Sequence, residues 1–98
     1  MGRPEKALVD AETPAGAFGS ALRDARHAAG MNQTELADRS GCSPATVSQV
    51  ERARFLPAYD LVLAWEVNLA ALGQLIPLWS EAVLRAHRRR RCSIPYEG

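Results

Sequence analysis

The residues best suited to specific polar chemistry lie within residues 32–54. An uncharged stretch, residues 40–50, carries small side chains, several hydroxyl groups and one amide, and Arg39, Arg52 and Arg54 flank it. Hydroxyl and amide groups donate and accept hydrogen bonds, whereas guanidinium groups bind phosphate and carboxylate. The chemistry of this stretch is therefore hydrogen bonding and anion binding.

Catalytic and metal chemistry find no support in the sequence. There is no paired acid and base around a plausible nucleophile and no phosphate-cradling loop. The two cysteines, Cys42 and Cys92, have no second Cys or His at ligand spacing, so a zinc site is excluded and both are interpreted as free thiols. We therefore expect no enzymatic activity, no cofactor and no metal.

Length and composition favour one small domain. The chain has 98 residues, with 47% hydrophobic and 6% aromatic content, which suits a single modest core. Residues 1–9 carry charges where a signal peptide needs apolar residues. The most apolar window, residues 61–79, is interrupted by polar residues and a proline, so no membrane span is expected. We predict a cytoplasmic protein.

Charge is unevenly distributed along the chain. The net charge is +1, but residues 58–84 carry three acidic and no basic groups, and residues 85–98 carry five basic groups and one acidic group. Proteins that bind polyanions strongly have a larger excess of positive charge. Any affinity for nucleic acid must therefore be local, modest, or increased by oligomerisation.

Hydrophobic periodicity predicts an all-α fold with five helices and no strands. Residues 1–16 lack an apolar period and are predicted to form a disordered arm. The first helix is expected over residues 17–29, with Gly30 ending it. A fourth helix is expected over residues 59–72, and a fifth from about residue 75 into the arginine run.

Two short helices with clear capping signals lie in between. Asn32 can cap the second helix, with Glu35 three residues later forming a capping box. Gly41 can adopt the positive φ of a tight turn, after which Ser43 caps a third helix that begins at Pro44. A small apolar contact between the two helices is expected from Leu36, Ala37, Val47 and Val50.

The spacing of these elements resembles the helix-turn-helix of the phage repressor and Cro type, the xenobiotic-response-element-like family of bacterial regulators. The residues that carry the resemblance, over about residues 19–70, are Leu22, Arg23, Arg26, Gly30, Gln33, Leu36, Ala37, Gly41, Ser43, Thr46, Val47, Ser48, Glu51, Arg52 and Pro57. Ala53 and Ala58 depart from the family, which often has glycine and serine there. Residues 59–82 are similar to actinobacterial members.

The resemblance implies a helix-turn-helix DNA-binding domain over residues 17–72, a C-terminal helix over 73–91 and a tail over 92–98. The third helix, about residues 43–52, would enter the major groove, where slim side chains reach base edges. The expected base-reading residues are Pro44, Ala45, Ser48 and Gln49. The expected phosphate-binding residues are Gln33, Ser43, Thr46, Arg52 and Arg54. Glu51 is expected to be a structural hydrogen-bond partner.

The apolar segment that follows predicts self-association. Of the 24 residues from Leu61 to Leu84, 17 are apolar, more than two helices can bury against a small core. A homodimer through residues 61–86 would cover them, with Trp65 and Trp79 as candidate interface anchors or, alternatively, core residues. A partner protein could also cover this surface, and the chain could be the start of a longer protein.

Together these features predict a sequence-specific, double-stranded DNA-binding transcriptional regulator, associated with the nucleoid and binding a pseudo-palindromic operator as a homodimer. The residues 88–91, all arginine, could either favour the helix dipole or hold phosphates non-specifically. The alternative is a protein-interaction adaptor or antitoxin-like partner that retains the helix-turn-helix shape.

Overall fold

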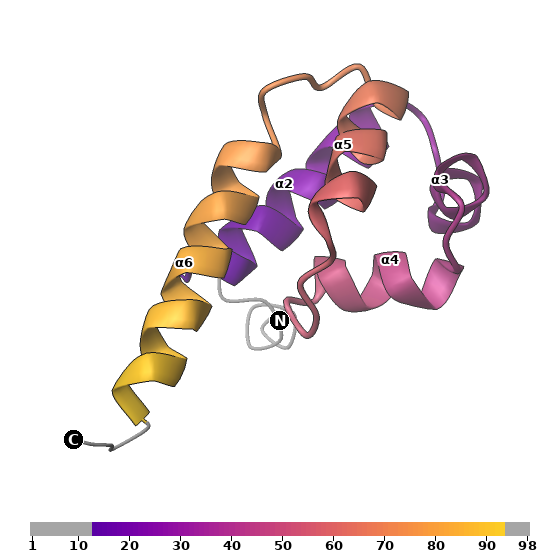
Figure 1. Ribbon diagram of the computed structural model, residues 1–98. Coiled ribbons are helices and arrows are strands. Elements are labelled where there is room, and N and C mark those ends of the chain that lie inside the picture. The colour runs from indigo at the N-terminus through magenta and orange to yellow at the C-terminus, as the bar shows by residue number, and fades with distance from the viewer. Residues whose placement is uncertain (1–12, 94–98) are drawn as a thin grey trace, which may run out of the picture.

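The computed structural model describes residues 13–93, with side chains described as far as residue 88, and this part of the chain contains five helices and no strand (Figure 1). The helices are α2 (Pro14–Ala28), α3 (Gln33–Ser40), α4 (Pro44–Glu51), α5 (Tyr59–Asn68) and α6 (Ile76–Ser93). The predicted all-α class and the five helices are confirmed. Most of the predicted N-terminal arm, and residues 94–98 of the predicted tail, lie outside the described residues.

Helix α2 begins three residues earlier than the sequence predicted. The Oγ1 atom of Thr13 accepts a hydrogen bond from the Gly16 N–H at 3.0 Å, and Pro14 occupies the first turn, where a missing N–H costs nothing. The prediction that residues 14–16 belong to a disordered arm is therefore wrong. The helix ends as predicted, with Gly30 at a φ of 72°.

The turn between α3 and α4 has the predicted capping. The Asn32 side chain accepts from the Glu35 N–H at 2.8 Å, and the Asn32 N–H donates to the Glu35 carboxylate at 2.9 Å. Gly41 adopts a φ of 76°, and the Ser43 hydroxyl accepts from the Thr46 N–H at 3.2 Å. These local signals fix both ends of the turn that joins the two helices.

Helix α5 ends at Asn68, four residues before the predicted end. Ala70 adopts a φ of 55°, and the Ala71 N–H donates to the Glu66 carbonyl at 2.8 Å, which is the Schellman arrangement usually built on glycine. The prediction of a continuous helix to residue 72 missed this ending because alanine rarely takes a left-handed conformation. At its other end, Ala58 caps the helix without a side-chain hydrogen bond.

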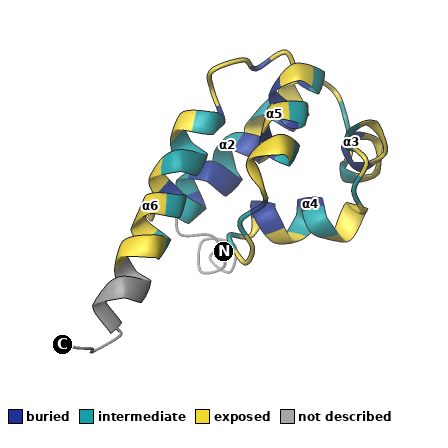
Figure 2. Cartoon of the chain, in the orientation of Figure 1, coloured by how far each residue is buried: buried dark blue, intermediate teal, exposed yellow. Residues whose placement is uncertain are grey.

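The core lies where α2, α3, α4 and α5 meet (Figure 2). Its residues are Phe18, Leu22, Leu36, Ala37, Val47, Val50, Val62, Trp65, Leu69, Ala71 and Leu75. The predicted apolar contact between the second and third helices is part of this cluster. Trp65 is fully buried at 0% exposure, so its prediction as an interface anchor is wrong, and the alternative reading as a core residue holds.

Helix α6 lies along α2, on the side of the molecule away from α3 (Figure 1). The buried Glu66 carboxylate accepts hydrogen bonds from the N–H groups of Leu75 at 2.9 Å and Ile76 at 2.7 Å. Burial raises the pKa of Glu66, but hydrogen bonds from the backbone of Ile76, Gly73 and Leu75 outweigh it and hold the pKa below its ordinary value. The carboxylate thus fastens the start of α6 to α5.

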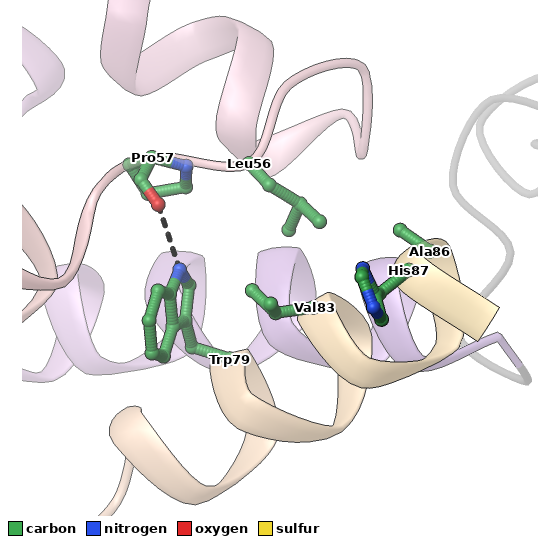
Figure 3. A pocket seen from close by; sticks show the side chains of 6 residues that line it. All are labelled: Leu56, Pro57, Trp79, Val83, Ala86 and His87. Atoms are coloured by element: carbon green, nitrogen blue, oxygen red, sulfur yellow. Dashed lines mark hydrogen bonds between the residues drawn. The ribbon is translucent and has the colours of Figure 1, made fainter. Parts of the chain in front are cut away.

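A second contact joins α6 to the segment before α5. The Trp79 Nε1–H donates to the Pro57 carbonyl at 2.7 Å (Figure 3). The centre of the Trp79 ring also lies 5.8 Å from that of Tyr59. A groove of about 360 Å³ continues from Trp79 along α6, with Val83 on its helical side and Leu56 opposite. None of the described helices combines the length and apolar character that crossing a membrane requires.

Candidate nucleic-acid interface

Helix α4 has two chemically different faces. Val47 and Val50 are 0% and 1% exposed and pack into the core, whereas Pro44, Ala45 and Gln49 are exposed. The period of 3.6 residues per turn separates these two sets. Three of the four predicted base-reading residues therefore lie on the outer surface. The fourth, Ser48, is half-buried and lies at the edge of that surface.

The predicted phosphate-binding residues occupy both ends of α4. At its start, Ser43 is exposed and Thr46 half-buried, and their hydroxyl groups are 3.0 Å apart in a hydrogen bond. At its end, Arg52 and Arg54 are exposed, and neither side chain makes a hydrogen bond or ion pair with any described residue. Within the part of the chain that the structure describes, two guanidinium groups are thus left for an external anion.

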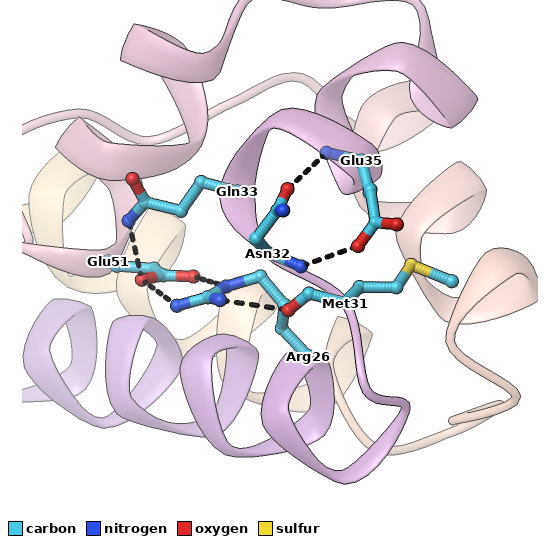
Figure 4. Close-up of polar contacts among 6 residues, drawn as sticks. All are labelled: Arg26, Met31, Asn32, Gln33, Glu35 and Glu51. Atoms are coloured by element: carbon cyan, nitrogen blue, oxygen red, sulfur yellow. Dashed lines mark hydrogen bonds and ion pairs between the residues drawn. The ribbon is translucent and has the colours of Figure 1, made fainter.

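A buried ion pair ties the end of α4 to α2 (Figure 4). The Arg26 Nε–H donates to Glu51 Oε2 at 2.7 Å, and the Arg26 Nη2–H donates to Glu51 Oε1 at 3.1 Å. The Arg26 Nη1–H donates to the Met31 carbonyl at 3.0 Å. Arg26 and Glu51 are only 7% and 4% exposed, so each charge depends on the other for compensation. The prediction of Glu51 as a structural partner is confirmed.

Gln33, predicted to bind phosphate, belongs to the same network (Figure 4). Its Nε2–H donates to Glu51 Oε1 at 3.0 Å, which orients the amide at the start of α3. A glutamine amide has two N–H donors, so one remains for another acceptor. The side chain is therefore held in place by the ion pair and still has a donor.

A close approach between α2 and α4 escaped the sequence analysis. A Cβ atom built on Gly19 would lie 2.7 Å from the Val50 carbonyl oxygen and 2.8 Å from that of Glu51. Only glycine fits at this crossing, because both neighbours are backbone atoms that cannot turn aside. A lone glycine inside a helical pattern is the signal that could have revealed the contact.

The region also contains one cysteine, and its other polar residues can be examined as metal ligands. Cys42, in the turn before α4, is a half-buried free thiol, and burial raises its pKa above the ordinary value. A raised pKa favours the protonated thiol at neutral pH, whereas the nucleophilic form of cysteine is the thiolate. Within the described residues, no three His, Cys, Asp or Glu side chains come together to hold a metal ion.

Comparison with known proteins places this geometry in a family. A family model described as a helix-turn-helix domain matches residues 17–73. No curated protein and no solved structure matches the chain significantly. The matched range begins within α2 and ends within the segment between α5 and α6, and it includes both helices of the turn and the Arg26–Glu51 pair. The chain therefore belongs to the helix-turn-helix domain family.

Proposed function

We propose that this protein is a transcriptional regulator that binds double-stranded DNA in a sequence-specific manner and acts in the cytoplasm, at the nucleoid. Its recognition element is α4, which enters the major groove. The observation that carries the proposal is the exposed, uncharged face of α4 beside Arg52 and Arg54, whose side chains have no partner among the described residues. A slim face of this kind fits the groove, and the guanidinium groups reach the phosphates on its rim.

Each exposed side chain of α4 has a role that its chemistry permits. The Gln49 amide can make two hydrogen bonds to the N6 and N7 atoms of adenine. Ala45 can contact a thymine methyl group, and Pro44 contributes a similar apolar surface. Ser48 can donate to or accept from a base edge. These groups would specify the sequence, whereas the phosphate contacts would only position the helix.

Gln33, Ser43, Thr46, Arg52 and Arg54 would provide the phosphate contacts. In Gln33 the second amide N–H would be used, since the first is occupied by Glu51. Arg52 and Arg54 would contribute the largest electrostatic share, because release of counterions from DNA scales with the number of phosphates neutralised.

Selection of bound fragments from a random duplex pool tests the proposal and yields the preferred site. At that site, Gln49→Ala should cost about 1–3 kcal/mol, relax selectivity at one base pair, and leave non-specific binding almost unchanged. Arg52→Ala should weaken binding to every duplex by a similar factor and reduce the salt slope by about one. Both residues are exposed, so both variants should remain folded by circular dichroism.

The result that contradicts the proposal is equally defined. If both variants lose specific and non-specific affinity in the same proportion, α4 does not read bases. If the wild-type protein selects no sequence and binds no duplex at low salt, the protein is better explained as an adaptor for another protein.

We further propose that two copies pair through residues 61–86, so that two α4 helices meet a pseudo-palindromic operator roughly 34 Å apart. Support comes from large apolar side chains that remain exposed in this range. They are Leu63 at 38%, Val67 at 62%, Leu72 at 69% and Leu84 at 54%. Trp79, in contrast, is half-buried and bonded to Pro57, so it holds α6 in place and is a poor probe of an interface.

Val67 provides the better probe of assembly because it is among the most exposed of these residues. Val67→Arg should shift the protein toward monomer in ultracentrifugation and weaken binding to two half-sites far more than binding to one. Ala29→Arg, at the exposed C-cap of α2, is the control that adds the same charge outside the proposed interface. A wild-type protein that is monomeric both free and on the two-half-site operator would contradict this proposal.

A further inference from the structure

A polar cleft opens beside α4, on the side facing α2 and the start of α3. Its volume is about 360 Å³. The lining residues are Arg23, Arg26, His27, Gln33, Ser48, Glu51 and Arg52. Three helices thus contribute to one cleft, and its lining contains three arginines, one histidine and a single carboxylate.

The carboxylate in the cleft is already neutralised. Both oxygens of Glu51 accept hydrogen bonds, from Arg26 and from the Gln33 amide, at 2.7–3.1 Å. All three nitrogens of the Arg26 guanidinium group donate, two to Glu51 and one to the Met31 carbonyl. The buried Arg26–Glu51 pair therefore forms an electrically neutral floor, and the net charge of the cleft is determined by the residues at its rim.

The rim consists of cationic and hydrogen-bonding side chains that have no partner among the described residues. Arg23, His27 and Arg52 are exposed, and none of their side chains makes a hydrogen bond or ion pair with another described residue. Asp24, the acidic neighbour of Arg23, does not lie in this cleft and instead lines a cavity on another side of α2, next to Leu75. The cleft thus has an excess of positive charge that no described carboxylate balances.

We infer that this cleft binds a backbone phosphate of the DNA strand that borders the groove occupied by α4, with Arg23 and His27 of α2 as phosphate contacts. The inference rests on the proposed function, since α4 must approach DNA for the strand to reach the cleft. Gln33, Ser48 and Arg52 lie on the DNA-facing surface in that proposal and line this same cleft. A phosphate held near Arg52 would therefore be within the reach of the long, unpaired Arg23 side chain.

The two residues of α2 have complementary chemistry toward such a ligand. The Arg23 guanidinium group can form two parallel hydrogen bonds to phosphate oxygens, strengthened by charge. His27 can donate a ring N–H to a third oxygen. The contact adds orientation as well as affinity, because it ties the strand to α2 in addition to α4. It reads no base, so it should act on all sequences alike.

The decisive experiment compares salt dependence for Arg23→Gln and the wild-type protein on the preferred duplex and on an unrelated one. We expect Arg23→Gln to weaken binding to both by a similar factor and to reduce the slope of log affinity against log salt by up to about 0.9. Arg23→Lys, which keeps the charge, should restore most of the slope. His27→Gln should lower affinity for both duplexes with little change in selectivity.

Arg39→Gln is the matched control, because Arg39 is an exposed arginine on α3 that does not line the cleft. Its salt slope should stay closer to that of the wild type than the slope of Arg23→Gln does. If Arg23→Gln has the wild-type slope and affinity while the wild type still selects a site, the cleft is no phosphate site and the proposed function stands. If the wild type binds no duplex, both the proposed function and this inference fail.

Inorganic phosphate distinguishes the DNA backbone from a free anion as the source of the ligand. Titrated into the DNA-free protein and followed by NMR of the arginine side chains, it should give only weak shifts that do not saturate. Saturation at the phosphate concentrations found in cells, lost in Arg23→Gln, would overturn the assignment to DNA and make the cleft a site for a free phosphate.

Discussion

Removal of one partner from the buried Arg26–Glu51 pair should be far more damaging than removal of both. Glu51→Leu leaves the guanidinium group of Arg26, a residue only 7% exposed in the wild type, with only the Met31 carbonyl as acceptor. Arg26→Met leaves the carboxylate of Glu51, a residue only 4% exposed in the wild type, with only the Gln33 amide as donor. Each variant keeps an uncompensated buried charge, and breaking such a pair typically costs about 3–5 kcal/mol.

That cost is large relative to the total stability of a domain of this size. Small domains have a free energy of unfolding of about 5–15 kcal/mol, and a modest core favours the low end of that range. Either single substitution should therefore populate the unfolded state measurably at room temperature. The double variant, Arg26→Met with Glu51→Leu, replaces both charges by apolar groups of similar volume. It should have a free energy of unfolding close to that of the wild type.

Urea unfolding followed by far-ultraviolet circular dichroism measures all four proteins of this cycle. The coupling energy between the two positions should be several kcal/mol, because each single substitution is costly whereas the double substitution costs almost nothing. The m-value should stay constant if the native surface is unchanged. Single variants that each cost less than about 1 kcal/mol, or a double variant that costs the sum of the two, would refute this account of how α4 is fastened to α2.

Further substitutions test other contacts, each by urea unfolding. Gly19→Ala should cost about 1–3 kcal/mol by collision with the Val50 carbonyl, although alanine is the better helix former; an unchanged midpoint would contradict the close approach. Ala53→Gly should stabilise the protein by about 1 kcal/mol, since Ala53 has a φ of 61°; a lower stability would contradict the left-handed conformation. Ala58→Ser should add about 1 kcal/mol by capping α5 with a side-chain hydrogen bond; a lower stability would contradict the position of this N-cap. Glu66 has a lowered pKa, so its carboxylate stabilises the fold at pH values above the ordinary carboxyl pKa of about 4.5, and this stability is lost as the pH falls through the folded-state pKa. Glu66→Gln should therefore cost about 1–3 kcal/mol at neutral pH and flatten the dependence of the free energy of unfolding on acid pH. An unchanged pH profile would contradict that linkage.

Local signals in the sequence predicted the turn between α3 and α4 well. The Asn32 capping box, the left-handed Gly41 and the Ser43 cap each depend on residues within three or four positions of one another. Interactions of this range are determined by backbone geometry and leave little to the rest of the fold. Hence the predicted start of α4 at Pro44, and the outward set of its residues, could be read from the chain directly.

Contacts between distant residues could not be predicted in the same way. Arg26 and Glu51 are 25 positions apart, and nothing in their spacing indicates that two charges will be buried together. The end of α5 was missed for a related reason, because the left-handed Ala70 is stabilised by its surroundings and not by its own preference. The fully buried Trp65 shows the same limit, since a helical apolar period indicates a buried face but not whether a core or a partner covers it.

The geometry of α4 explains how so short a helix is held in one position. Eight residues make little more than two turns, which is too short for an isolated helix to be stable in water. Its position is instead imposed from outside: Val47 and Val50 pack in the core, Gly19 allows α2 to approach within contact of its carbonyls, and Glu51 is bound to Arg26. All of these contacts lie on one face of α4, so the residues on its other face are not needed to hold the helix in place. In the proposed function, the exposed residues could therefore vary with the DNA sequence that is read, while the contacts that hold α4 in place remain as they are.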